Sequence, residues 1–95
     1  MSFAFVAQVT FAEGTDPEFA QKMLETEVVP MVSSQSGFQK GIWVRNIDGK
    51  TGIGTAVFDT RANAEAAGEA VRKQPRPDQA PQITTAAVYE VVAEA

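Results

Sequence analysis

The chain of 95 residues contains neither cysteine nor histidine. Without cysteine no disulfide can form, which agrees with a reducing compartment. Without thiolate and imidazole ligands a structural zinc site is close to excluded. Catalysis by cysteine or histidine is excluded, and so is haem ligation through histidine.

Clusters of positive charge and long apolar runs are missing as well. The net charge is −4, from 12 acidic and 8 basic residues, and the longest basic cluster is the pair Arg72 and Lys73. Nucleic-acid binding requires a concentrated positive surface, so we expect none. The first apolar stretch, residues 3–9, is too short to span a membrane and lacks the basic start of a signal peptide. We therefore expect a cytoplasmic protein that does not bind membranes.

The length and the patterning predict one domain that covers residues 1–95. Alternation of apolar and polar residues predicts strands at residues 3–11, 38–47, 51–58 and 83–92. Apolar residues at three- and four-residue spacing predict a first helix, capped by Thr15 or Asp16 with a Thr15-x-x-Glu18 capping box, that ends within residues 33–37. A second helix, capped by Asp59 or Thr60, has a narrow face of small residues: Ala62, Ala66, Ala67, Ala70 and Val71.

Three local features interrupt this regular pattern. Pro30 lies inside the apolar stripe of the first helix, where it predicts a kink or a tightened turn near residues 26–29. Gly52 and Gly54 in the third strand indicate a bulge or a place where another group approaches the backbone closely. The proline-rich segment 74–82 predicts a long loop, which is the segment free to cover a ligand site.

The order β-α-β-β-α-β predicts a ferredoxin-like α+β fold, with a four-stranded antiparallel sheet and two helices on one face. Right-handed crossovers place the first and third strands in the middle of the sheet. The uncovered face would show two apolar sets, one of Ile53, Thr55 and Val57 and one of Ala86, Val88 and Val92. An apolar face of this kind needs a partner, and we expect a second copy of the chain, which makes a homodimer.

Several segments resemble the dimeric α/β-barrel superfamily, and most of all its antibiotic-biosynthesis-monooxygenase-like proteins. The resemblance rests on the helix interrupted by Pro30 and on three segments: Ser-Gly-Phe at 36–38, Asp-Gly-Lys-Thr-Gly at 48–52 and Val-Phe-Asp-Thr at 57–60. It implies two sheets packed face to face as a barrel, with a small pocket in each subunit between the sheet and the helices. It also implies cofactor-independent oxygenation of aromatic polyketides as one activity, whereas haem degradation is excluded because no histidine can hold the iron.

The candidate ligand-binding residues are Trp43, Arg45, Asn46 and Tyr89. Trp43 and Tyr89 are the large amphipathic side chains of the strands, and each has an alternative role, at the subunit interface or in the sheet. No catalytic residue can be assigned, and nothing requires a metal or an organic cofactor. Met23 and Met31 lie where they could edge an adaptable pocket or belong to the core.

Two functions stay open at this stage. One is a dimer that binds a small organic ligand or is purely structural, and the residues favour it because no polar cluster replaces the missing histidine. The other is a cofactor-independent monooxygenase of an aromatic or polyketide-like substrate. The volume of the space between the first helix and the sheet distinguishes the two functions. An enzyme needs a cleft of a few hundred Å³ there. A structural dimer would fill the space with apolar side chains, namely Phe3, Phe5, Phe19, Met23 and Leu24.

Overall fold

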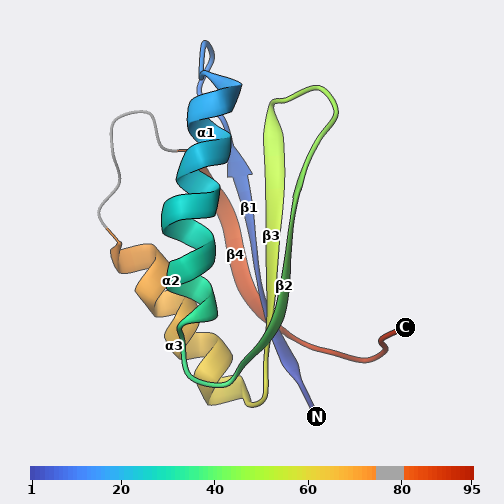
Figure 1. The fold of residues 1–95 in the computed structure, drawn as a ribbon. Helices are drawn as coiled ribbons and strands as arrows, with labels where there is room; N and C mark the ends of the chain where they lie inside the picture. Colours follow the sequence, from blue (N-terminus) through green and yellow to red (C-terminus); the bar gives the residue numbers. More distant parts are fainter. Residues whose placement is uncertain (75–80) are drawn as a thin grey trace.

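A computed structural model describes residues 1–74 and 81–95 and has the expected sheet with both helical segments on one side (Figure 1). The elements in chain order are β1 Phe3–Thr10, α1 Pro17–Met23, η1 Leu24–Val28, α2 Val29–Ser33, β2 Phe38–Arg45, β3 Thr51–Phe58, α3 Arg61–Lys73 and β4 Gln82–Glu90. The strands are antiparallel in the order β2-β3-β1-β4, so the first and third strands are central, as predicted. The ferredoxin-like fold is therefore confirmed.

Both helical segments begin at side-chain caps. Asp16 accepts a hydrogen bond from the Glu18 N–H at 3.0 Å, and Thr60 accepts one from the Asn63 N–H at 3.1 Å. The capping box predicted from Thr15 is absent, because the Thr15 hydroxyl donates to the Ala12 carbonyl instead. Each cap satisfies a backbone donor that the first helical turn leaves free.

The first helical segment runs without interruption through α1, η1 and α2, and its middle piece is a π-helix. There the Val29 N–H donates to the Leu24 carbonyl, five residues earlier, rather than four. An irregular turn just before Pro30 was predicted as a kink or a tightened turn, but the helical turn there is widened instead. A wider turn relieves the contact between the proline ring and the preceding carbonyl, and it places the missing donor where the helix is already irregular.

Helix α3 packs close to the sheet through Ala64, Ala67 and Gly68, which are buried. A Cβ atom at residue 68 would lie 2.7 Å from Cε1 of Phe5, so the ring rests directly on the backbone of Gly68. The predicted face was wrong for Ala62 and Ala66, which are exposed. The buried face is rotated around the helix relative to the face predicted from the alanines, because α3 approaches the sheet most closely at Gly68.

The last strand contains an irregularity that decides which side its residues face. The register with β1 shifts between Gln8 and Val9, and the Thr84 hydroxyl donates to the Gln8 carbonyl at 3.1 Å. Val88 pairs with Phe5, whose ring contacts α3, so Val88 faces the helices. The prediction that Ala86 and Val88 lie on the uncovered face was therefore wrong: alternation separates two sets of residues but does not say which set is covered.

The uncovered face of the sheet carries large apolar side chains. Ile42 is 62% exposed, Val44 50%, Ile53 41% and Tyr89 57%. Ile53, Thr55 and Val57 lie on this face as predicted, since Val57 pairs with Ala4 and Ala4 pairs with Tyr89. The chain then continues past β4, and Glu94 forms an ion pair with Lys40 on β2, the opposite edge strand.

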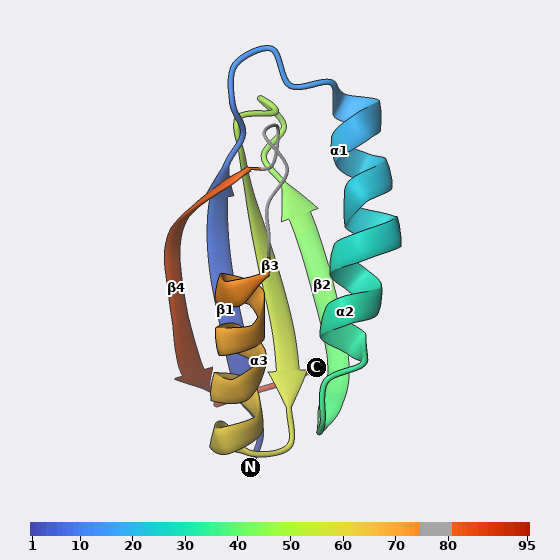
Figure 2. The ribbon, with the colours of Figure 1, turned by 90° about the vertical axis from the view of Figure 1, so that its left-hand side faces the viewer.

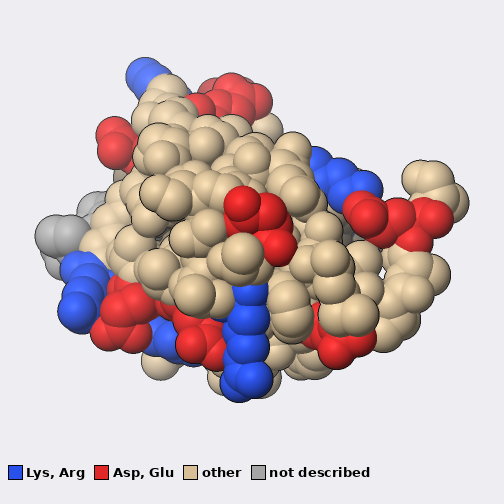
Figure 3. Space-filling view, turned by 90° about the horizontal axis from the view of Figure 1, so that it is seen from below, with Lys and Arg blue, Asp and Glu red and all other residues tan. Residues whose placement is uncertain are grey.

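Charged side chains of both signs are interspersed on the end of the molecule that Figure 3 shows. This face offers no broad basic surface of the kind that nucleic acids require. Within the described residues, no helix is long and apolar enough to cross a membrane. Residues 1–74 and 81–95 also contain no group of three or more acidic side chains placed to hold a metal ion.

Candidate ligand-binding site

A cavity of about 810 Å³ lies between the first helical segment and the sheet. Its floor is formed by small residues of the central strands: Ala7, Gly52, Gly54 and Ala56. Its roof is formed by apolar side chains of the helical segment: Phe19, Met23, Leu24, Val28 and Met31. Figure 2 shows this helical segment standing beside β2, while α3 lies in front of β1 and β3.

The cavity exists because the residues of its floor have small side chains and the residues of its roof are not buried against the sheet. On β3 the helix-facing positions are Gly52, Gly54 and Ala56, and Ala7 of β1 pairs with Gly54. These side chains rise little above the backbone. None of the residues of α1 or η1 is buried, and Phe19 is 40% exposed. The apolar side chains that would fill a purely structural core therefore leave the space open.

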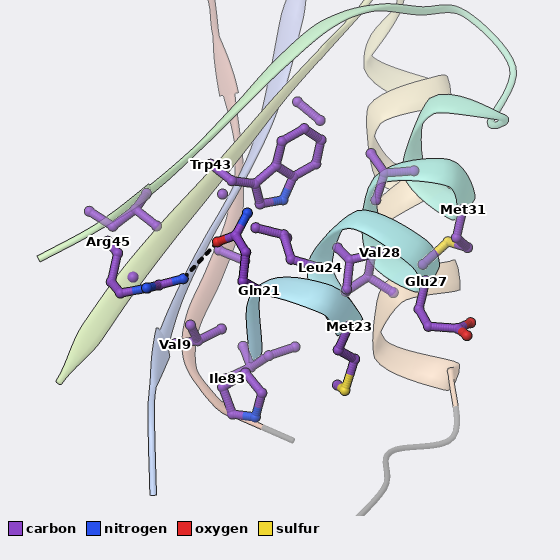
Figure 4. A pocket seen from close by; sticks show the side chains of 18 of the residues that line it. Val9, Gln21, Met23, Leu24, Glu27, Val28, Met31, Trp43, Arg45 and Ile83 are labelled. Atoms are coloured by element: carbon purple, nitrogen blue, oxygen red, sulfur yellow. Dashed lines mark hydrogen bonds between the residues drawn. The ribbon is translucent and has the colours of Figure 1, made fainter. Parts of the chain in front are cut away.

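Trp43 forms one wall of the cavity and lies flat on the sheet. A Cβ atom at Gly54 would lie 2.8 Å from both Cδ1 and Nε1 of the indole, and one at Gly41 would lie 2.8 Å from Cζ3 and Cη2. One face of the ring therefore packs against the two glycines, and the other face is directed toward the helical segment (Figure 4). The close approach predicted at Gly54 is thus made by Trp43.

The indole N–H of Trp43 makes no hydrogen bond with any residue in the described part of the chain. Figure 4 shows the nitrogen on the edge of the ring that points toward Leu24 and Gln21. An aromatic ring with a free donor at its edge can stack on a flat molecule and fix its orientation at the same time.

Arg45 joins the sheet to the helical segment at one end of the cavity. Its Nη2 donates to Oε1 of Gln21 at 2.9 Å, the bond drawn as a dashed line in Figure 4. Its guanidinium carbon lies 5.8 Å from the centre of the Phe11 ring, which is within cation–π distance. Gln21 in turn donates from Nε2 to Oε1 of Glu25 at 2.8 Å. Arg45 is therefore held in a defined position, although it is exposed.

The structure brings two of the four candidate residues to the cavity and places the other two elsewhere. Trp43 and Arg45 line it, as do Met23 and Met31. Asn46 belongs to the β2–β3 turn, where its Oδ1 accepts from the Asp48 N–H at 3.1 Å and its own N–H donates to the Thr51 carbonyl. Tyr89 lies on the uncovered face of the sheet, since it pairs with Ala4, and not beside the cavity.

Four polar residues of the cavity lining were not predicted, namely Gln21, Lys22, Thr26 and Glu27. Gln21 lies between Ala20 and Lys22 in the sequence, and nothing in the helical pattern separates it from a solvated position. The predicted covering loop, residues 74–82, falls largely on residues 75–80, which lie outside the described residues. The described ends of that loop, Gln74 and Pro81, line the cavity.

The comparisons with known proteins find similarity in structure and not in sequence. No protein-family model matches the chain, and no curated protein matches it. Among solved structures, a variant of SnoaB, a cofactor-independent oxygenase from Streptomyces nogalater, superposes with a TM-score of 0.66 at 13% identity over 98% of this chain and 95% of that one. A candidate monooxygenase from Shewanella loihica gives a TM-score of 0.66 at 17% identity over 99% of both chains.

A candidate antibiotic biosynthesis monooxygenase from Chloroflexus aurantiacus superposes with a TM-score of 0.61 at 11% identity, over 100% of this chain and 97% of that one. The chain has the fold of the antibiotic biosynthesis monooxygenase-like proteins. The resemblance to this part of the dimeric α/β-barrel superfamily is thereby confirmed for the fold. At these identities an antibiotic biosynthesis monooxygenase-like fold carries no assignment of reaction or substrate.

Proposed function

We propose that the protein binds a small, flat, mainly apolar organic molecule in the cavity between the first helical segment and the sheet. The observation that carries this proposal is the cavity itself, because about 810 Å³ lies within the range of roughly 300–1,000 Å³ typical of ligand sites. The apolar roof from the helical segment and the indole wall, which lies flat on the sheet, favour an aromatic ligand. A purely structural role is disfavoured, because a structural core would be filled.

The ligand would stack on the exposed face of Trp43 and accept a hydrogen bond from its indole N–H. The two glycines below the ring support this arrangement, since they hold the indole parallel to the sheet. Met23 and Met31 on the roof adapt easily to different shapes, because the methionine side chain is unbranched and polarisable. No step of this binding requires a metal or an organic cofactor.

A cofactor-independent monooxygenase of an aromatic or polyketide-like substrate is the second candidate function. It is favoured by the similarity in fold to SnoaB, which is described as a cofactor-independent oxygenase. In such a reaction an electron-rich substrate itself supplies the electrons that reduce dioxygen. The cavity would hold and orient that substrate, and the Trp43 N–H is the donor placed to bind an oxygen atom of it.

We further propose that two copies of the chain pair through their uncovered sheet faces as a dimeric barrel. The apolar residues Ile42, Val44, Ile53 and Tyr89 support this proposal, because each is at least 41% exposed in the single chain. A stable pairing of this kind buries roughly 800 Å² on each subunit. We also propose a cytoplasmic location, with which the absence of cysteine agrees.

A thermal-shift screen of aromatic metabolites and polyketides tests the binding proposal, since a ligand stabilises the folded state by RT ln(1 + [L]/Kd). For each hit, binding and oxygen consumption are then measured in Trp43→Phe and in Tyr89→Phe. We expect Trp43→Phe to weaken binding about tenfold, because the ring remains but the N–H is lost. Tyr89→Phe serves as the control and should bind as the wild type does. Unchanged binding in Trp43→Phe would place the ligand elsewhere, and binding without oxygen consumption would reject the monooxygenase.

A further inference from the structure

We propose that the end of the cavity at Arg45 takes an anionic group, so that the ligand is a flat apolar acid. This inference rests on the proposed binding function and adds the charge of the ligand to it. It starts from the partners of the arginine side chains. Arg61 and Arg72 each lie within ion-pair distance of a glutamate, whereas Arg45 pairs with no carboxylate in the described residues.

The contacts of Arg45 hold the guanidinium without neutralising it. One Nη2 donor is used by the neutral amide of Gln21, and the ring of Phe11 lies under the cation. Gln21 also binds an acidic side chain of its own helix, since its Nε2 donates to Oε1 of Glu25 at 2.8 Å. The remaining guanidinium donors have no partner among residues 1–74 and 81–95. Their planar arrangement matches the two oxygens of a carboxylate or a sulfonate.

The other charged groups around the cavity agree with an acidic ligand at this end. Lys22 also lines the cavity. Glu27 is the acidic residue of the lining, and Figure 4 shows its carboxylate pointing away from Trp43 and Arg45. Arg45 also lines a second hollow of about 550 Å³, whose charged lining consists of Arg45, Lys50 and Glu13.

The spacing along β2 sets the shape of the ligand. Trp43 and Arg45 are two residues apart on the same strand, so their Cα atoms lie roughly 7 Å apart on one face of the sheet. This distance is about the length of a fused two-ring system. A ring stacked on Trp43 therefore brings an acidic substituent of a neighbouring ring to the guanidinium of Arg45.

Two fluorescent probes of nearly identical shape test this inference. 1-Anilinonaphthalene-8-sulfonate carries a sulfonate, and N-phenyl-1-naphthylamine is the same ring system without it. The probes are titrated into the wild type, Arg45→Gln, Arg45→Lys and the control Arg61→Gln, which removes an exposed arginine of α3. Shifts of the backbone amides of β2 and η1 in NMR spectra confirm that a probe sits in the cavity.

We expect the wild type to bind the sulfonate at least tenfold more tightly than the neutral probe. Arg45→Gln should lose this preference while its affinity for the neutral probe stays within about twofold, and Arg45→Lys and Arg61→Gln should keep it. Equal affinity of the wild type for both probes, or an unchanged preference in Arg45→Gln, would overturn the anionic end and leave the cavity as a ligand site. Failure of both probes to shift the amides of β2 and η1 would overturn the cavity as a ligand site and the anionic end with it.

Discussion

Trp43 and Gly54 are paired residues of β2 and β3, and the indole lies so close to Gly54 that a Cβ atom there would be 2.8 Å from Cδ1 and Nε1. Real Cβ atoms do not approach other atoms so closely. The position of the ring, and with it the shape of the cavity, therefore depends on the absence of a side chain at residue 54.

Gly54→Ala should push the indole away from the sheet and into the cavity. We expect the free energy of unfolding to fall by about 1–3 kcal/mol, as in overpacked cores, and ligand affinity to fall with it. Chemical denaturation and probe titration measure the two effects. The same substitution in a Trp43→Ala background is the control, and there its cost should largely disappear. An equal cost in both backgrounds would show that the indole is not the obstacle.

Pro30→Ala should convert the π-helical turn toward an ordinary α-helix. An alanine supplies the missing N–H, which can bond the carbonyl four residues earlier, so we expect the free energy of unfolding to stay within about 1 kcal/mol of the wild type or to rise slightly. Removing the widened turn rotates α1 relative to α2 and carries Gln21 away from Arg45. The cavity should shrink, and probe affinity should fall.

The matched control for this change is Ser33→Ala in the last turn of the same segment, which leaves Pro30 in place. Denaturation curves and probe titrations of both variants make the comparison. Retention of full probe affinity by Pro30→Ala would show that the proline does not shape the cavity.

Ile42→Lys should separate the two subunits of the proposed dimer without unfolding them. The side chain is 62% exposed in the single chain, so a lysine there costs the monomer little, but it would place a charge in an apolar interface. Multi-angle light scattering should show the mass of one chain for this variant and of two chains for the wild type. Ala62→Lys, at an exposed position of α3, is the control and should keep the wild-type mass.

Val88→Lys gives the opposite pattern, because Val88 packs against the core on the helix side of the sheet. We expect it to lower the free energy of unfolding rather than to change the mass of a folded species. A wild type that scatters as a single chain at micromolar concentration would contradict the proposed pairing.

Much of the fold follows from local patterns in the sequence. Periodicity and turn residues predict the order of the elements. Short polar residues predict each cap to within two positions, Thr15 or Asp16 and Asp59 or Thr60, and the structure has Asp16 and Thr60. Trp43 and Arg45, two of the four candidates, line the same cavity, because alternate residues of one strand share a face. The glycines of β3 signalled a close approach, and at Gly54 the approaching group is Trp43, whereas Gly52 lies against Val44 and Phe11.

The rest depends on contacts between distant segments. Tyr89 was placed with the wrong neighbours, because alternation leaves the choice of face open and a bulge in β4 changes the phase. Asn46 is adjacent to Arg45 in the sequence, yet it serves the turn. Gln21 belongs to the site because it accepts a hydrogen bond from Arg45, which is 24 residues away in the sequence. The periodicity of a helix contains no information on such a contact.

The absence of any buried residue in α1 has a kinetic consequence. A segment with so little burial can detach from the sheet at a small fraction of the free energy of global unfolding, while the core around Phe58 stays intact. Amide hydrogens of residues 18–23 should therefore exchange with solvent much faster than those of β1 and β3. If ligands enter by this route, the observed association rate should level off at high ligand concentration, at the rate at which α1 opens.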